Sequence, residues 1–92
     1  MYVIAQHRVV DPEAFFADIP AVAAKAPPGV HPRMFCPSAD RATAVCLWQA
    51  DSIEAVRDYL DDVSAGASEN SYFEVGAEHA LGLPEVARAG ER

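Results

Sequence analysis

Five side chains of this 92-residue sequence have the chemistry of transition-metal ligands. They are three imidazoles and two thiols: His7, His31, His79, Cys36 and Cys46. Imidazole and thiolate suit nickel, copper or zinc, and we take His7, His31 and Cys46 as the predicted ligands. Their spacing matches no local zinc motif, so such a site has to assemble across strands or between two chains. The alternative is a polar strand or loop residue for each histidine and a small buried apolar group for each cysteine.

His7 leaves two interpretations open, because it lies in the middle of a strand predicted to be central. If it faces the uncovered side of the sheet, it can approach Cys46, Arg33 or Trp48. If it faces the helices, it is a hydrogen-bonded core histidine. A neutral imidazole with a pKa near 6.5 is also competent as a general base, so an enzyme remains an alternative to a metal-binding protein.

Four segments have the composition of strands and two have helical periodicity. The strands are predicted over residues 2–10, 30–37, 41–50 and 68–77, and the helices between Asp11 and Pro27 and between Asp51 and Gly66.

Three residues mark the predicted helix boundaries. Asp11 suits an N-cap because Pro12 follows it, and Asp51 takes the N-cap place of a capping box. Pro20 cannot donate its backbone hydrogen bond and crowds Phe16, so we expect a kink or break there.

The order β-α-β-β-α-β is the split βαβ pattern, which predicts an α+β, ferredoxin-like fold with a four-stranded antiparallel sheet. Right-handed crossovers place the first and third strands centrally and both helices on one face. We expect one domain over residues 1–78, followed by a C-terminal arm over residues 79–92 with a short docked segment.

Alternation along the second and third strands predicts two sets of side chains, with Phe35 paired with Ala44 and Arg33 with Cys46. We expect Met34, Cys36, Thr43, Val45 and Leu47 to lie under the helices. The uncovered face then displays His31, Arg33, Phe35, Ala44, Cys46 and Trp48.

An uncovered apolar face of this kind marks an interface or a groove, and a second copy of the chain is its simplest cover. The sequence therefore predicts a homodimer. The predicted interface or pocket residues are Arg33, Phe35, Trp48 and Tyr72.

This arrangement resembles the dimeric α/β-barrel proteins. Within that group, the stretch from Cys46 to Arg57, CLWQADSIEAVR, resembles "C-[aliphatic]-[aromatic]-x-A-x-x-x-E-A-V-R" of a family of small bacterial proteins. The family includes a nickel-binding member, so the resemblance implies a small homodimeric protein that binds a transition metal such as nickel.

Dimeric α/β barrels also include cofactor-independent monooxygenases, isomerases and cyclases, which use a cavity between sheet and helices. The resemblance thus implies the alternative of an enzyme with His7 as base and Trp48, Phe35 or Tyr72 as apolar walls. No catalytic set such as Ser–His–Asp is recognisable in the sequence, and no organic cofactor is indicated.

The composition excludes several partners. Fourteen acidic and seven basic side chains give a formal net charge of −7, and such a surface repels phosphate backbones and anionic membranes. No apolar run approaches the length of a membrane span, and the N-terminus lacks the pattern of a secretory signal. We therefore expect a cytoplasmic protein that binds neither nucleic acid nor membrane.

Overall fold

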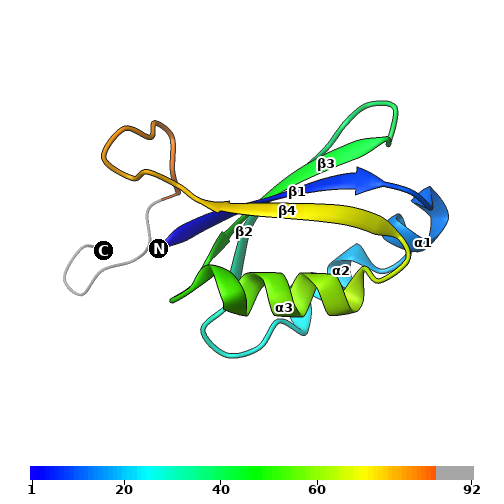
Figure 1. Ribbon diagram of the computed structural model, residues 1–92, viewed down its shortest axis with the longest axis horizontal. Helices are drawn as coiled ribbons and strands as arrows, with labels where there is room; N and C mark the ends of the chain where they lie inside the picture. The colour runs from blue at the N-terminus through cyan, green and yellow to red at the C-terminus, as the bar shows by residue number, and fades with distance from the viewer. Residues whose placement is uncertain (85–92) are drawn as a thin grey trace.

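A computed structural model of the chain describes residues 1–84 (Figure 1). It has four strands and three helices within that range. The strands are β1 (Tyr2–Val9), β2 (His31–Pro37), β3 (Thr43–Gln49) and β4 (Ser68–Glu74), and the helices are α1 (Pro12–Phe16), α2 (Ile19–Ala24) and α3 (Ile53–Val63).

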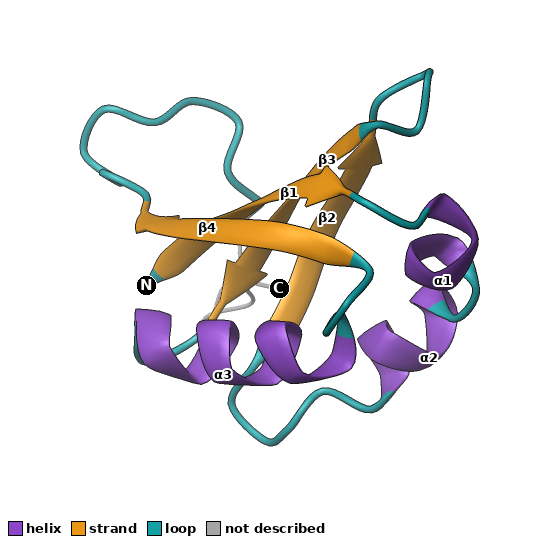
Figure 2. Ribbon diagram, turned by 45° about the vertical axis from the view of Figure 1, so that its right-hand side comes forward, coloured by secondary structure: helices purple, strands orange, loops and turns teal. Residues whose placement is uncertain are grey.

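The strands form one antiparallel sheet in the order β2-β3-β1-β4. Both views show the three helices on the same side of this sheet (Figures 1 and 2). The protein is therefore α+β and compatible with a ferredoxin-like fold, and the prediction that the first and third strands are central is confirmed.

The first predicted helix is broken in two, at a point just before Pro20. Asp11 caps α1 by accepting a hydrogen bond from the backbone N–H of Ala14, at 3.2 Å. Pro20 lies in the first turn of α2, where a missing N–H costs nothing because that turn has no intrahelical acceptor for it. The break predicted from the proline is thus present, and it lies upstream of the proline.

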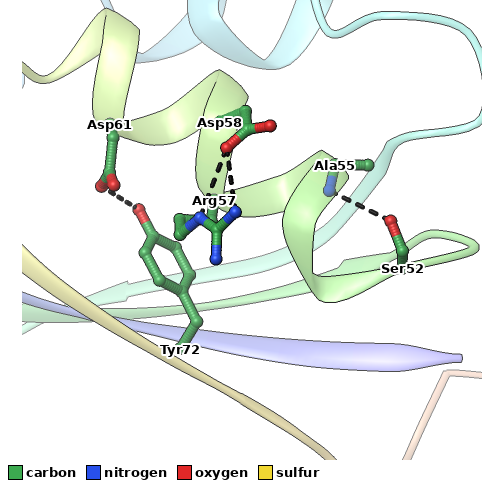
Figure 3. Close-up of polar contacts among 6 residues, drawn as sticks. All are labelled: Ser52, Ala55, Arg57, Asp58, Asp61 and Tyr72. Atoms are coloured by element: carbon green, nitrogen blue, oxygen red, sulfur yellow. Dashed lines mark hydrogen bonds and ion pairs between the residues drawn. The ribbon is translucent and has the colours of Figure 1, made fainter.

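The cap of α3 corrects a smaller prediction. Ser52, not Asp51, is the N-cap, and its hydroxyl accepts a hydrogen bond from the backbone N–H of Ala55 at 3.1 Å (Figure 3). Serine and aspartate are equally good caps, so two adjacent candidates cannot be separated by residue type. The buried face of α3, with Val56 and Leu60, packs on the sheet.

Trp48 lies beneath the helices, which corrects the prediction that it faces the uncovered side of the sheet. Its side chain is 4% exposed and belongs to the core cluster that includes Val56 and Leu60 of α3. Its ring makes an edge contact with Tyr59 of the same helix at a centroid distance of 6.2 Å. Both alternating sets are apolar, so alternation groups the residues without saying which group the helices cover.

The pairing of β2 with β3 is two residues away from the predicted register. Phe35 lies opposite Cys46, where the prediction had it opposite Ala44. Because side chains alternate with a period of two, a shift of two residues does not change which side chains share a face of the sheet. Phe35, Ala44, Cys46 and Trp48 therefore stay together, on the helix side.

A register shift between Pro32 and Met34 separates His31 and Arg33 from that set. Arg33 has no partner in the ladder, and His31 lies opposite Gln49, on the uncovered face. An extra residue in one strand reverses the alternation on its far side, which is why His31 no longer shares a face with Phe35.

The uncovered face is also apolar, and its apolar residues include those that the sequence predicted to lie under the helices. Ile4, Leu47 and Phe73 are neighbours across three strands, with Met34 opposite Leu47. Met34 and Phe73 are 49% and 44% exposed, and Val45 on the same face is 40% exposed. A continuous apolar strip thus crosses the sheet on the side that the helices leave open.

The segment after β4 forms no helix or strand up to Pro84, whose carbonyl oxygen accepts a hydrogen bond from the Tyr2 hydroxyl. The predicted arm begins in this segment, and its residues 85–92 lie outside the described part of the chain. None of the helices in residues 1–84 combines the length and the apolar character that crossing a bilayer requires.

Candidate functional site

A cavity of about 360 Å³ lies between the sheet and the helices. This volume is at the lower end of the range for small-molecule sites. Its wall is mainly apolar and draws on both layers, with Phe15, Ile19, Val22, Phe35, Trp48 and Leu60 among its residues. The described lining includes two charged residues, Asp18 and Arg33, and both are exposed. The Arg33 guanidinium donates to Gln49 Oε1.

His7 and Cys46 supply the polar groups at the sheet side of this cavity. His7 lies opposite Ala44 and Cys46 opposite Ala5, so the two are diagonal neighbours on one face of β1 and β3. Diagonal neighbours are within reach of a ring and a thiol. His7 Nε2 lies 3.0 Å from Cys46 Sγ, and the two residues are 4% and 7% exposed.

Asn70 holds the other side of the imidazole. It lies directly opposite His7 on β4, and its Oδ1 is 2.6 Å from His7 Nδ1. Asn70 Nδ2 lies 2.9 Å from both Asp61 Oδ1 and Ser64 Oγ on the helix side. The amide therefore joins the imidazole to α3 and to the residue that follows it.

The direction of every hydrogen bond in this network follows from the two groups that accept from Asn70, the Asp61 carboxylate and the Ser64 hydroxyl. The Asp61 carboxylate can only accept, and the Ser64 hydroxyl donates to the carbonyl of Leu60 at 2.6 Å. Both must accept from the Asn70 amide nitrogen, so Asn70 Oδ1 faces His7. His7 then donates from Nδ1 and presents the lone pair of Nε2 to Cys46.

Cys46 completes the chain as a donor to His7 and an acceptor from the indole. Its S–H donates to His7 Nε2, and Trp48 Nε1 donates to Cys46 Sγ at 3.2 Å. This indole bond favours negative charge on the sulfur, while burial acts against it. Burial dominates and raises the pKa of Cys46 to about 11.

Burial also lowers the pKa of His7, against the opposing effects of the Asn70 hydrogen bond and the Asp61 charge. The Phe15 ring covers the imidazole at a centroid distance of 5.2 Å. At neutral pH the pair is therefore a neutral imidazole and a neutral thiol, with one lone pair directed at one S–H.

Asp61 anchors the exposed end of the network. The Tyr72 hydroxyl donates to Asp61 Oδ1 at 2.6 Å (Figure 3). This bond and the one from Asn70 lower the pKa of Asp61, whereas burial and the bond to Asp61 raise the pKa of Tyr72. An ionised carboxylate therefore stands at the solvent end of a chain whose inner end is in the cavity.

Arg33, Phe35 and Trp48, three of the predicted pocket or interface residues, line the cavity. The fourth, Tyr72, packs against the core and points its hydroxyl to Asp61. His31 is elsewhere: it is exposed and lines a second, smaller depression that it shares with Arg33.

The predicted metal ligands are only partly brought together, because His7 and Cys46 are adjacent and His31 is on the other face of the sheet. Within residues 1–84, no group of three or more His, Cys, Asp or Glu side chains is placed to hold a metal ion. Binding of nickel, copper or zinc stays a prediction.

Sequence reasoning missed Asn70, Asp61 and Phe15 as parts of the site. The sequence could have indicated Asn70, since it is two residues from Tyr72 along the fourth strand and so lies on the same face. Asp61 left none, because it is one of several acidic residues on the outer side of α3.

Fold and site together define a small α+β protein with an apolar cavity between sheet and helices and a thiol–imidazole–amide hydrogen-bond network in its wall. Comparisons of the chain with protein-family models, with curated proteins and with solved structures find no match. The likeness to dimeric α/β-barrel proteins stays a resemblance.

Proposed function

We propose that this protein binds a small, mainly apolar organic molecule in its cavity and acts on it without a cofactor, with His7 as the proton acceptor. The observation that carries this proposal is the 360 Å³ cavity with His7 in its wall. A large apolar pocket with a few convergent polar groups is the usual form of a ligand site.

The protonation state of His7 supports the role of a base. Its lowered pKa keeps the imidazole neutral at pH 7, and its Nδ1 is committed to Asn70. Nε2 is then the atom that accepts a proton, and it is the atom directed at Cys46 in the cavity wall.

Ligand binding is testable with the protein's own reporter, because Trp48 is the single tryptophan and lines the cavity. Small apolar fragments should change its fluorescence at micromolar to millimolar concentration. Val22→Phe, which fills the cavity, should weaken this response at least tenfold. Val10→Phe is the matched control, at a residue that is 56% exposed and outside the described lining. Equal responses in the two variants would contradict the proposal.

A transition metal is the second candidate, supported by the adjacent His7 Nε2 and Cys46 Sγ. Calorimetry with nickel, copper and zinc on tag-free protein tests it, and His7→Gln and Cys46→Ser should each weaken binding. His31→Gln is the control if the pair alone holds the metal. Binding no tighter than millimolar would end this candidate.

We also propose that the protein is a homodimer through the uncovered face of the sheet. The support is the strip that contains Met34, Val45 and Phe73, each 40–49% exposed. Apolar surface of this kind is uncommon on monomers when it is contiguous. Sedimentation should give twice the 9.9 kDa chain mass.

Val45→Asp should shift that equilibrium toward the monomer, because it places a charge within the apolar strip. Val10→Asp introduces the same charge at an exposed valine outside the strip and should leave the mass unchanged. A wild-type monomer at micromolar concentration would contradict the homodimer.

A further inference from the structure

The order of groups around His7 is that of a nucleophile, its base and the group that orients the base. Cys46 Sγ is 3.0 Å from His7 Nε2, and His7 Nδ1 is 2.6 Å from Asn70 Oδ1. The same three side-chain types in the same order serve thiol-dependent acyl transfer on unrelated folds, where they are recognised by geometry and not by sequence position. Here they come from β3, β1 and β4.

We propose that Cys46 is a nucleophile, and that the Cys46–His7–Asn70 chain hydrolyses small apolar esters or thioesters bound in the cavity. This inference rests on the proposed ligand cavity and adds the reaction class. Cys46 and His7 are the catalytic residues, because both line the space that the substrate occupies. Asn70 is a positioning residue, since it acts through the imidazole.

The contact between Cys46 and His7 determines how the thiol is activated. The S–H of Cys46 is directed at the lone pair of His7 Nε2, 3.0 Å away, so this nitrogen is placed to receive the proton. The lone pair of His7 Nε2 takes the proton as the S–C bond forms, in the manner of a hydroxyl nucleophile with an adjacent base. Trp48 Nε1, 3.2 Å from the sulfur, offsets the partial negative charge on Sγ as its proton leaves and before the S–C bond is complete.

Atoms and charges balance over two steps. First, Sγ adds to the ester carbonyl while its proton passes to His7 Nε2, and the negative charge that balances the imidazolium goes to the carbonyl oxygen. The carbon–oxygen bond to the leaving alcohol then breaks, and the alcohol takes that proton. Second, a water attacks the thioester, His7 accepts the water's proton and returns it to Sγ as the carbon–sulfur bond breaks. The sum is ester plus water giving acid plus alcohol.

The lining of the cavity sets the substrate class. Its apolar wall favours an acyl group without charge, and its volume at the lower end of ligand sites favours a short one. The probe is therefore 4-nitrophenyl butyrate, whose reaction is followed by release of 4-nitrophenol and by the mass of the intact chain.

The full-length chain should gain the mass of one butyryl group, located on Cys46 by peptide mapping. Cys46→Ala and Cys46→Ser should abolish this thioester. Cys36→Ala is the matched control, because Cys36 is the other free cysteine of the described residues, is exposed and lies on the uncovered face. His7→Gln should slow acylation about 100-fold or more, the usual contribution of a general base. Circular dichroism checks that each variant folds.

Asn70 is tested by a pH profile, which a purely structural role would not move. The groups that face His7 are Cys46 on β3, Asn70 on β4, Asp61 on α3 and the Phe15 ring on α1. Because the Asn70 bond raises the pKa of His7, Asn70→Ala should move the acidic limb of the rate profile to lower pH and lower its plateau. An unchanged limb would remove Asn70 from the mechanism.

Failure of this inference can be told from failure of the ligand site. N-phenylbutyramide has the shape of the probe but is far less reactive, and it should change Trp48 fluorescence in a way that Val22→Phe weakens. If the amide binds and the ester forms no adduct on Cys46, the nucleophile is overturned and the cavity stands. If the amide does not bind either, both proposals fall.

Discussion

Both faces of the sheet carry apolar side chains, and they differ in how far their residues are buried. On the helix side, Val3, Ala5 and Trp48 are at most 4% exposed, and the polar His7 among them is fully hydrogen-bonded. On the uncovered side, Met34, Val45 and Phe73 are 40–49% exposed, whereas Leu47 among them is 7% exposed.

The difference indicates what each face is for. Burial of an imidazole, a thiol and an amide costs free energy unless each finds a partner, and the described residues contain no buried side-chain polar atom without one. A hydrogen-bonded network of these three groups beside a cavity is suited to catalysis. An apolar strip with few polar groups is suited to association.

The difference between the two faces is tested most directly by truncating one aromatic side chain on each of them. Trp48→Ala on the helix side should lower the free energy of unfolding by about 3–5 kcal/mol, the usual loss for a buried aromatic side chain. Phe73→Ala on the uncovered side should cost less than about 1 kcal/mol where the chain is monomeric, because 44% of that residue is already exposed. Urea denaturation followed by circular dichroism measures both, and equal losses would contradict the distinction.

The reactivity of the two cysteines is a second test of the difference between the faces, since Cys36 is on the uncovered side and Cys46 on the helix side. With a pKa of about 11 instead of 9.0, Cys46 has about a 100-fold smaller thiolate fraction than an unperturbed thiol. Dithiobisnitrobenzoate, a bulky dianion, should therefore modify the exposed Cys36 much faster than the buried Cys46. Cys36→Ser and Cys46→Ser, studied separately, assign the two rates. Comparable rates would show that the helix side is open to water.

His7 and His31 differ in the same way and predict a pH dependence. A buried His7 binds its proton less tightly in the folded chain than in the unfolded one, so the free energy of unfolding should fall as the pH drops below about 6.5. The slope is at most about 1.4 kcal/mol per pH unit for one proton. His7→Gln should remove this slope between about pH 7 and 5, and His31→Gln, at an exposed position, should keep it. A slope that persists without His7 would assign it to other groups.

The smallest effect is expected from the Arg8–Glu69 ion pair on the uncovered face. Both side chains are mostly exposed, and pairs of this kind contribute below about 1 kcal/mol. A double-mutant cycle with Arg8→Ala and Glu69→Ala at low and high salt measures the coupling. A coupling well above that limit would mean that another chain covers this part of the face.

Local signals in the sequence predicted most of the fold. The Asp11–Pro12 start, the interruption associated with Pro20 and the alternation of Phe35, Cys46 and Trp48 each depend on neighbours in the chain. All three are present in the structure. What failed was the side of the sheet on which Trp48 lies, since that depends on where the helices pack and two apolar faces give no preference.

The site was predicted in part for the same reason. His7 and Cys46 were expected to meet if they shared a face, and they do, but on the covered side of the sheet. Asn70 required the register of β4 against β1, and Asp61 required the position of α3 over that pair. Contacts between distant segments of this kind leave no periodic signal along the chain.

The interrupted helix before Pro20 forms the less stable part of the cavity wall. α1 and α2 have five and six residues, and neither buries a residue completely. Helices this short have little stability of their own, whereas α3 has eleven residues and a buried stripe. Because Phe15, Ile19 and Val22 form this part of the wall, local opening of residues 12–24 would widen a cavity that is already partly open to solvent, without disturbing the sheet.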